Sequence, residues 1–229
     1  LQWLPKLENN ITEKIKKNFR LSLNHSFINS RSNHEDEINL SKYLFKNKNK
    51  FKKSELKKVN LNIISGSNIN FMVRSIFLNG LRNYTNININ SFEKYNLFES
   101  FILYENKRKY SKEKTINFLA LDTLDLVNFK KNQPIENYVK IIEKILQALN
   151  KENNTIIIQN LVNYKYLGYI DQINKKLLKL SKKYKLILFD INKYSKSIGT
   201  KNWFDQAKYE FAKIPISFDN LNFYSYKLT

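Results

Sequence analysis

The sequence predicts an α/β fold of three layers, in which a five-stranded parallel sheet lies between helices in the flavodoxin-like order 2-1-3-4-5. Two observations predict it. From residue 59 onward, short apolar runs alternate with amphipathic stretches of helical period, which is typical of βαβ units. Runs such as Ile156-Ile157-Ile158 are wholly apolar, as strands buried on both faces require. Right-handed crossovers then favour a doubly wound sheet.

Each element follows from where the apolar residues fall along the chain. Residues 115–122 are nearly all apolar and predict a buried strand, whereas residues 70–84 have one apolar face at helical spacing. Pro134 opens another amphipathic stretch at a position where helices tolerate proline. We expect strands at residues 59–65, 86–90, 115–122, 155–162 and 185–191, and helices at residues 70–84, 91–104, 134–150 and 170–184.

Residues 1–58 are polar and weakly patterned. We expect them to form a helical and loop-like extension that packs on a sheet domain of residues 59–229, with short helices at 11–19 and 39–51 and a loop at 25–36. The two histidines, His25 and His34, both lie in this extension. Neither has an aspartate or histidine partner at helical spacing, so we expect solvated surface side chains rather than ligands or bases.

The composition excludes several classes of protein. Of the 229 residues 42% are hydrophobic, which is too many for a disordered chain, and none is cysteine. A disulfide scaffold, a thiolate metal site and a cysteine nucleophile are therefore excluded. Two histidines are too few for a multi-histidine metal site, and we expect no metal and no cofactor. No apolar stretch approaches the roughly 20 residues of a membrane span, and no signal peptide opens the chain, so we expect a cytoplasmic protein without a membrane span.

The chain is strongly basic, with 40 Lys and Arg against 20 Asp and Glu and a net charge of +20. Such a charge is typical of a nucleic-acid-binding protein, and the Lys-rich residues 46–58 and 107–114 would be its best support. However, Asn, Ile, Phe and Tyr are enriched as well, and all have codons that can be written with A and T alone. A base-composition bias explains the Asn as well as the Lys. We favour that interpretation and do not expect nucleic acid as a partner.

Polar residues follow the predicted strands at their carboxyl ends, where ligands bind in open α/β sheets. A serine between a strand and a helix can be activated by a base, with backbone N–H groups nearby to stabilise an oxyanion. Each of these residues also has a structural interpretation, because Ser, Asn and Asp commonly cap helices and turns. The candidates are Ser65, Gly66, Ser67, Asn68, Asp122, Thr123, Asp125, Gln159, Asn160 and Asp190.

The C-terminal stretch of residues 198–217 reads IGTKNWFDQAKYEFAKIPIS. Its Gly-x-x-x-Trp-Phe-Asp run, followed by Ala-Lys-x-Pro-x-Ser, resembles the N-terminal domain of FkbH-like proteins of the HAD superfamily (the HAD-IIIC type). The matching residues are Gly199, Trp203, Phe204, Asp205, Ala212, Lys213, Pro215 and Ser217. Residues 3–5, 40–45, 64–71 and 157–160 also resemble segments of that domain, so the resemblance covers nearly the whole chain.

The resemblance implies a fold like that of the SGNH hydrolases, and Ser67 matches the position of their nucleophile. Two other positions depart from the SGNH pattern. The block after the third strand, which should hold an Asn, reads Leu-Asp-Thr-Leu-Asp over residues 121–125, and the Asp-x-x-His position reads Asp205-Gln206-Ala207-Lys208. Without a histidine, Ser67 would need an unusual base, such as Lys208 or Lys213 with a pKa lowered by burial. We therefore do not expect ordinary ester hydrolysis.

In FkbH-like proteins this domain precedes a HAD domain with an Asp-x-Asp-x-Thr motif, which in some members loads a glyceryl unit onto an acyl carrier protein. The chain contains no such motif. It is therefore expected to be either an excised domain or a protein without the second half. The resemblance implies that its partners are an acyl carrier protein, a downstream HAD domain or a small ester or acyl substrate.

We therefore predict an accessory domain, degenerate as a hydrolase, that binds an acyl, glyceryl or sugar-linked substrate or a carrier protein in surface-polysaccharide or secondary-metabolite biosynthesis. One alternative is an active Ser-dependent esterase or acyltransferase with a base other than histidine; another is a basic nucleic-acid-binding protein. The predicted catalytic residues are Ser67, Asp205 and Lys213. The predicted substrate-binding residues are Gly66, Asn68, Asp122, Asn160 and Trp203.

Overall fold

A computed structural model describes residues 34–51, 56–107, 114–151, 154–164 and 167–229. The expected helix at residues 11–19 and the side chain of His25 lie outside these ranges. Backbone contacts divide the chain into two compact units. The sheet unit comprises residues 59–71 and 88–220, and the second unit comprises residues 72–87 and 221–229 together with the segment that ends at Lys58.

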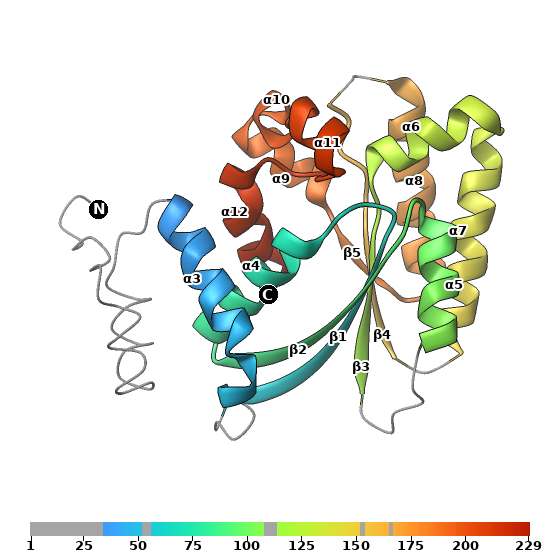
Figure 1. The fold of residues 1–229 in the computed structure, drawn as a ribbon. Coiled ribbons are helices and arrows are strands. Elements are labelled where there is room, and N and C mark those ends of the chain that lie inside the picture. Colours follow the sequence, from blue (N-terminus) through green and yellow to red (C-terminus); the bar gives the residue numbers. More distant parts are fainter. Residues whose placement is uncertain (1–33, 52–55, 108–113, 152–153, 165–166) are drawn as a thin grey trace. The chain divides into compact units, whose positions relative to one another are not determined.

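Five strands form one sheet in the order β2-β1-β3-β4-β5, which confirms the predicted fold class (Figure 1). The strands are β1 (Lys57–Ser65), β2 (Thr85–Glu93), β3 (Thr115–Ala120), β4 (Thr155–Gln159) and β5 (Ile187–Phe189). β3 runs parallel to β1 and β4, and β4 runs parallel to β5; Ile64 is paired with Leu119, for example, and Ile158 with Leu188. The carboxyl ends of β1, β3, β4 and β5 therefore lie along one edge of the sheet.

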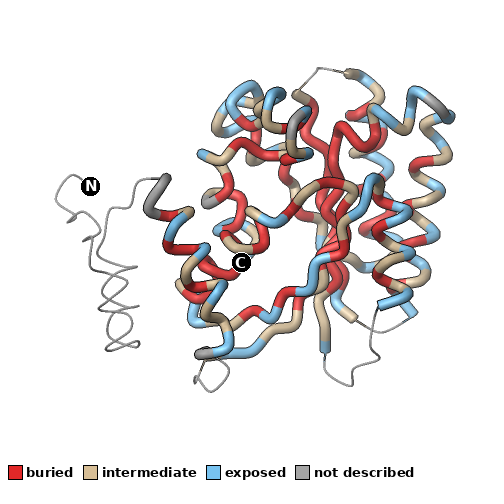
Figure 2. The backbone as a smooth tube through the Cα atoms, viewed as in Figure 1, coloured by how far each residue is buried: buried red, intermediate tan, exposed pale blue. Residues whose placement is uncertain are grey.

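One face of the sheet is covered by α5 (Leu97–Lys107), α7 (Ile135–Asn150) and α8 (Gly168–Lys183), with α6 (Thr123–Asn132) beside them. Figure 2 shows that burial is concentrated in the strands and on the inward sides of these helices. From α7, Ile142 and Leu146 are fully buried in the same core cluster as Leu119 and Ile158 of the strands. Burial of each such side chain contributes about 1.5–3 kcal/mol, so the amphipathic pattern of α7 secures its position.

Four short helices follow β5 in the chain: α9 (Ile191–Ile198), α10 (Thr200–Trp203), α11 (Gln206–Ala212) and α12 (Phe218–Leu228), which continues into the second unit. The ring of Phe189 in β5 lies edge-on to that of Phe118 in β3 and also contacts Tyr194 of α9. Asp190 caps α9 by accepting a hydrogen bond from the backbone N–H of Lys193. The end of β5 is thus joined directly to the next helix.

The second unit contains α3 (His34–Lys46), the 3-10 helix η1 (Lys48–Phe51) and most of α4 (Asn70–Arg82). Arg82 of α4 forms an ion pair with Glu37 of α3, and the ring of Phe77 lies edge-on to that of Phe45. The hydroxyl of Ser75 donates a hydrogen bond to the carbonyl oxygen of Leu221. These contacts join the three chain segments of the unit.

Several predicted boundaries were wrong. The expected helix at 91–104 begins only at Leu97, because β2 continues to Glu93 with Phe92 buried on its inner side. β4 ends at Gln159 rather than at 162, since the backbone of Leu161 instead forms hydrogen bonds with the side chain of Asn174. The part of the expected loop at 25–36 that the structure describes already belongs to α3, and α6 and the helices after β5 were not predicted.

Candidate active site

The side chains of Ser67 and Asp122 meet at the carboxyl edge of the sheet. Ser67 follows β1, and Asp122 follows β3, the strand beside it. The hydroxyl of Ser67 donates a hydrogen bond of 2.6 Å to Oδ2 of Asp122. The other carboxylate oxygen of Asp122 accepts from the backbone N–H of Leu124 at 3.2 Å, so that Asp122 caps α6. Parallel neighbouring strands thus bring together two residues that are 55 positions apart in the chain.

Asp122 is a buried carboxyl group, with 7% of its surface exposed. Burial raises its pKa above the ordinary value, while hydrogen bonds from Ser67, from the backbone of Leu124 and from Tyr209 oppose the increase. Burial is the larger effect, so the carboxyl group holds its proton more tightly than an exposed aspartate does. Because it also accepts the hydrogen bond of the Ser67 hydroxyl, this carboxyl group is the candidate proton acceptor for Ser67.

Tyr209 of α11 is the third member of the cluster. Its hydroxyl interacts with the side chains of both Asp122 and Ser67. Burial, followed by the negative charge of Asp122, raises the pKa of Tyr209 well above the ordinary value, so the phenol stays protonated and acts as a hydrogen-bond donor. Tyr164 lies in the same region: its ring stacks on that of Phe204 at 4.3 Å between centroids, and burial, followed by the charge of Asp122, raises its pKa.

The cluster made by Ser67, Asp122 and Tyr209 is connected to the loop that contains Lys213. The backbone N–H of Asn68 donates to the carbonyl oxygen of Lys213 at 2.9 Å. Lys213 ends α11 in the left-handed conformation, with φ of 55°, and its ammonium group lies 4.9 Å above the ring of Tyr209. The side chain of Asn68 accepts from the backbone N–H of Asn70 and caps the start of α4, which is the structural role that its residue type also allowed.

Asn160 joins the loops that follow β4 and β5. Its amide nitrogen donates to the carboxylate of Asp190 at 2.6 Å, and its amide oxygen accepts from the backbone N–H of Asn192 at 3.0 Å. Both ends of the amide are therefore used within the protein. Gln159, the residue before it, donates to the carbonyl oxygen of Leu121 and so connects β4 with the end of β3.

Asp205 and Trp203 have partners of their own in the C-terminal segment. The carboxylate of Asp205 caps α11 by accepting from the backbone N–H of Lys208 and pairs with its ammonium group at 2.9 Å; both hydrogen bonds lower the pKa of Asp205. Trp203 is buried, and its carbonyl oxygen accepts from the backbone N–H of Ser217. Among the described residues, no hydrogen bond joins the side chain of Ser67 to that of Asp205 or Lys213.

The predicted residues thus fall into two groups. Gly66, Ser67, Asn68 and Asp122 come together, and the carbonyl oxygen of Lys213 contacts this group. Asn160, Asp205 and Trp203 are tied to other partners. Tyr209 and Tyr164 were not predicted, because they come from distant parts of the chain and neither follows a strand directly. Within the described ranges, no three His, Asp or Glu side chains are grouped closely enough to hold a metal ion.

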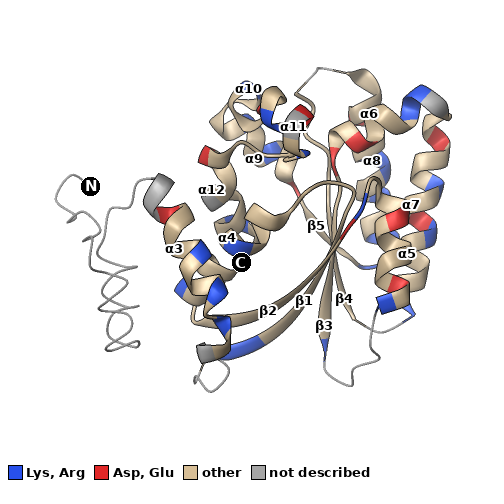
Figure 3. Cartoon of the chain, in the orientation of Figure 1, with Lys and Arg blue, Asp and Glu red and all other residues tan. Residues whose placement is uncertain are grey.

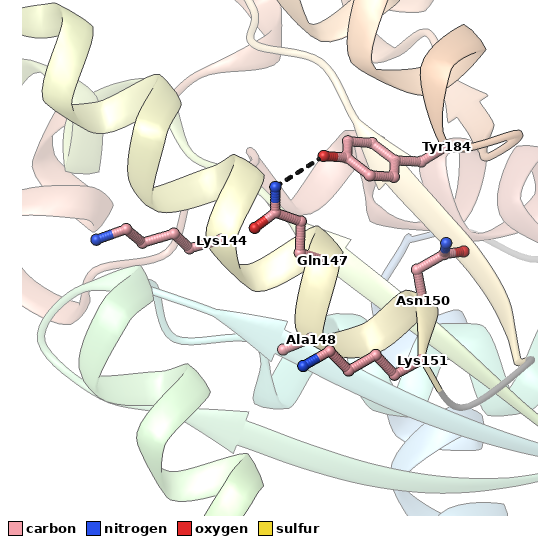
Figure 4. A pocket seen from close by; sticks show the side chains of 6 residues that line it. All are labelled: Lys144, Gln147, Ala148, Asn150, Lys151 and Tyr184. Atoms are coloured by element: carbon pink, nitrogen blue, oxygen red, sulfur yellow. Dashed lines mark hydrogen bonds between the residues drawn. The ribbon is translucent and has the colours of Figure 1, made fainter.

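Lys residues are spread over several helices of the sheet unit, notably α7 and α8 (Figure 3). One cavity of about 530 Å³ is basic and is lined by Lys144, Gln147, Lys151 and Tyr184 at the end of α7 (Figure 4). Gln147 donates to the hydroxyl of Tyr184, which in turn donates to Glu143. None of the predicted site residues lines this cavity.

Neither a protein family nor a curated protein sequence matches the chain. Solved structures do. The N-terminal part of protein BF1531 from Bacteroides fragilis, which contains a phosphatase domain and was crystallised with Mg, is similar with a TM-score of 0.65 and 17% identity over 81% of this chain. This chain spans about half of it (54%). A member of the lipolytic G-D-S-L family from Veillonella parvula is similar with a TM-score of 0.52 and 11% identity, over 75% of this chain and 95% of that one.

None of the described helices is long and apolar enough to cross a membrane. At these identities the structural likeness establishes the fold alone, and the chemistry has to be inferred from the side chains. The sheet order, the position of Ser67 after β1 and both similar structures agree on one conclusion: the chain has an SGNH-like (G-D-S-L-like) α/β fold and resembles the N-terminal part of a phosphatase-domain protein.

Proposed function

We propose that this chain is an accessory, FkbH-like domain with an SGNH fold whose hydrolase site is degenerate and serves for binding. The observation that carries the proposal is the hydrogen bond from the Ser67 hydroxyl to the buried carboxyl group of Asp122. In an SGNH hydrolase the serine would be paired with a histidine, but the sheet unit contains none, because His25 and His34 precede it in the sequence.

The Ser67–Asp122 pair is a weak nucleophile for two reasons. A carboxylate, even one with a raised pKa, remains a far weaker base than a serine alkoxide, so the proton stays on the serine. Furthermore, only 2% of Ser67 is exposed, so an ester carbonyl has little access to its hydroxyl oxygen. These side chains are better suited to forming hydrogen bonds than to attacking a substrate.

The ligand that we propose is an acyl, glyceryl or sugar-linked substrate, free or attached to a carrier protein, in surface-polysaccharide or secondary-metabolite biosynthesis. The likeness to BF1531 supports this proposal, because that protein joins a similar domain to a phosphatase domain. Asn68 and Tyr209 would supply hydrogen-bond donors at the edge of the sheet. Lys213, whose side chain is exposed, would supply a positive charge for an acidic carrier protein, and Asp205 a carboxylate at the start of α11.

A fluorophosphonate probe, which labels only activated serines, tests the degenerate site. We expect the wild-type protein to be labelled no more than the Ser67→Ala variant, and neither to hydrolyse p-nitrophenyl acetate above background. Labelling that disappears in Ser67→Ala would contradict the proposal. In a second arm, phosphopantetheine-loaded acyl carrier protein is titrated into the protein; Lys213→Asn should weaken binding several-fold at low salt. The matched control Lys176→Asn, on the exposed side of α8, should not.

The same probe tests the second candidate function, a Ser-dependent esterase or acyltransferase in which Asp122 is the base. The 2.6 Å separation of the two oxygens and the neighbouring Tyr209 favour it. This candidate requires that labelling is lost in Asp122→Asn as well as in Ser67→Ala, while both variants remain folded.

A further inference from the structure

A second cavity, of about 380 Å³, lies between the loop after β2 and helices α5, α6 and α7. Tyr95 of the loop and Phe98 of α5 belong to its lining. Asp125 and Phe129 of α6 and Tyr138 of α7 line it as well. Ser67, Asp122 and Tyr209 do not line it, so the cavity adjoins that cluster through Asp125 without including it.

Asp125 is the one charged residue among the described residues that line this cavity. Its carboxylate accepts hydrogen bonds from the backbone N–H of Leu97 and, at 3.4 Å, from the hydroxyl of Tyr138. The titratable groups that interact with it are Asp122, Tyr138 and Tyr209, and none of these can carry a positive charge. A negative charge therefore lies in a cavity of a chain whose net charge is +20 without a cation beside it.

Burial, followed by the charge of Asp122, raises the pKa of Asp125 to about 7. At neutral pH the carboxyl group is then ionised in about half of the molecules. A bound cation would favour the ionised form, because an opposite charge nearby lowers the pKa of a carboxyl group.

The remaining walls are rich in aromatic rings. The rings of Phe129 and Tyr138 lie at 62° to each other with centroids 5.3 Å apart. Tyr95 and Phe98 are exposed, at 93% and 50%, although both are large hydrophobic residues. Aromatic faces attract organic cations through cation–π interactions and also accommodate their alkyl groups. A cavity that is lined by four aromatic residues and a single carboxylate suits an alkylammonium group.

We propose that this cavity binds an organic ammonium ion, with Asp125 as the counter-ion and the rings of Tyr95, Phe98, Phe129 and Tyr138 around the alkyl groups. The proposal does not depend on any role of Ser67. Asn128 and Gln133 also line the cavity and would be free to bind a polyol, which makes a neutral ligand the outcome to be tested against the cation.

The experiment is a titration of the protein with tetramethylammonium and n-butylammonium chloride, followed in ¹H–¹⁵N spectra at about pH 6 and about pH 8 and at constant ionic strength. With a pKa of about 7, the ionised fraction of Asp125 increases roughly tenfold between these pH values, so the apparent affinity should increase about tenfold. Sodium chloride and glycerol serve as the control solutes.

Two variants complete the test. Asp125→Asn should abolish the pH dependence and most of the binding, and Phe98→Ala, at an exposed position, should weaken binding several-fold. Glu136→Gln removes an exposed carboxylate of α7 that does not line the cavity and should change nothing. The proposal is overturned by non-saturable shifts, by equal affinity at both pH values, by unchanged binding in Asp125→Asn, or by glycerol binding as well as the ammonium ions.

Discussion

The carboxyl groups of Asp122 and Asp125 lie at the start of the same helix, α6, where the first caps the helix and the second lies in its first turn. Both are buried, and burial raises the pKa of each, while the charge of Asp122 raises that of Asp125 further. The Ser67 hydroxyl stabilises only the first of the two. The ionised Asp125 therefore destabilises the folded protein.

The Asp125→Asn variant should be more stable than the wild-type protein above neutral pH. The folded protein holds the Asp125 proton with a pKa of about 7, and the unfolded chain with an ordinary value of 3.8, so the wild type loses stability as the pH rises between these values. The full difference is on the order of 4 kcal/mol. Urea unfolding at several pH values measures it, as the free energy of the variant minus that of the wild type.

That difference should be smallest near pH 4 and largest near pH 8. A comparison between variants is needed because the net charge of the whole chain also changes with pH. Glu136→Gln, an exposed substitution with the same loss of charge, provides the control and should show a flat difference. A flat difference for Asp125→Asn as well would show that the pKa of Asp125 is not raised.

Gly66→Ala should destabilise the protein by about 1–3 kcal/mol. A Cβ atom at Gly66 would lie 2.8 Å from the backbone nitrogen of Leu97 and 3.0 Å from the carboxyl carbon of Asp125, so the loop after β1 or the start of α5 must shift. Gly168→Ala is the matched control. Its Cβ atom would meet nothing within 4 Å at the first residue of α8, and we expect no loss of stability. The midpoints of thermal unfolding of both variants test this prediction. Equal midpoints would contradict the close packing at Gly66.

Asn160→Ala should lower the free energy of unfolding by about 1–3 kcal/mol, because it removes two hydrogen bonds of a buried side chain and takes the side-chain acceptor from the backbone N–H of Asn192. Asn150→Ala, at the exposed end of α7, is the control and should change it by less than about 0.5 kcal/mol. Urea unfolding measures both. If Asn160 served ligand binding alone, the two variants would be equally stable.

The sequence predicted the sheet better than the helices at its edge. β3 and β4 are largely apolar runs, and β1 has apolar residues that alternate with Asn before Ile63 and Ile64, so the existence and order of these strands could be inferred from the alternation with helices such as α7 and α8. α6 was missed because its stripe of apolar residues is short, although Asp122 before it was already recognised as a cap candidate. The helices after β5 are only 4–11 residues long, and in such short elements tertiary contacts outweigh local pattern.

The candidate site could be predicted only where it depends on strand order. Ser67 and Asp122 were found because each follows a strand, and the parallel pairing of β1 with β3 brings their side chains together. Tyr209 reaches the cluster from α11, whose position depends on the folding of the C-terminal segment rather than on any local motif. The same holds for the cavity at Asp125, which is formed by three helices that are separate in the chain.

Lys213 combines a backbone contact with the charge that we propose for it, and mutagenesis has to separate the two. Its carbonyl oxygen holds the backbone of Asn68, next to Ser67, and the carbonyl points there because the residue is left-handed. A β-branched or bulky replacement would strain that conformation and displace the serine loop whatever its charge, whereas Asn and Gly adopt it readily. Position 213 thus fixes the backbone conformation of this loop and also carries a charge. Only substitutions that keep the left-handed conformation test the effect of the charge alone.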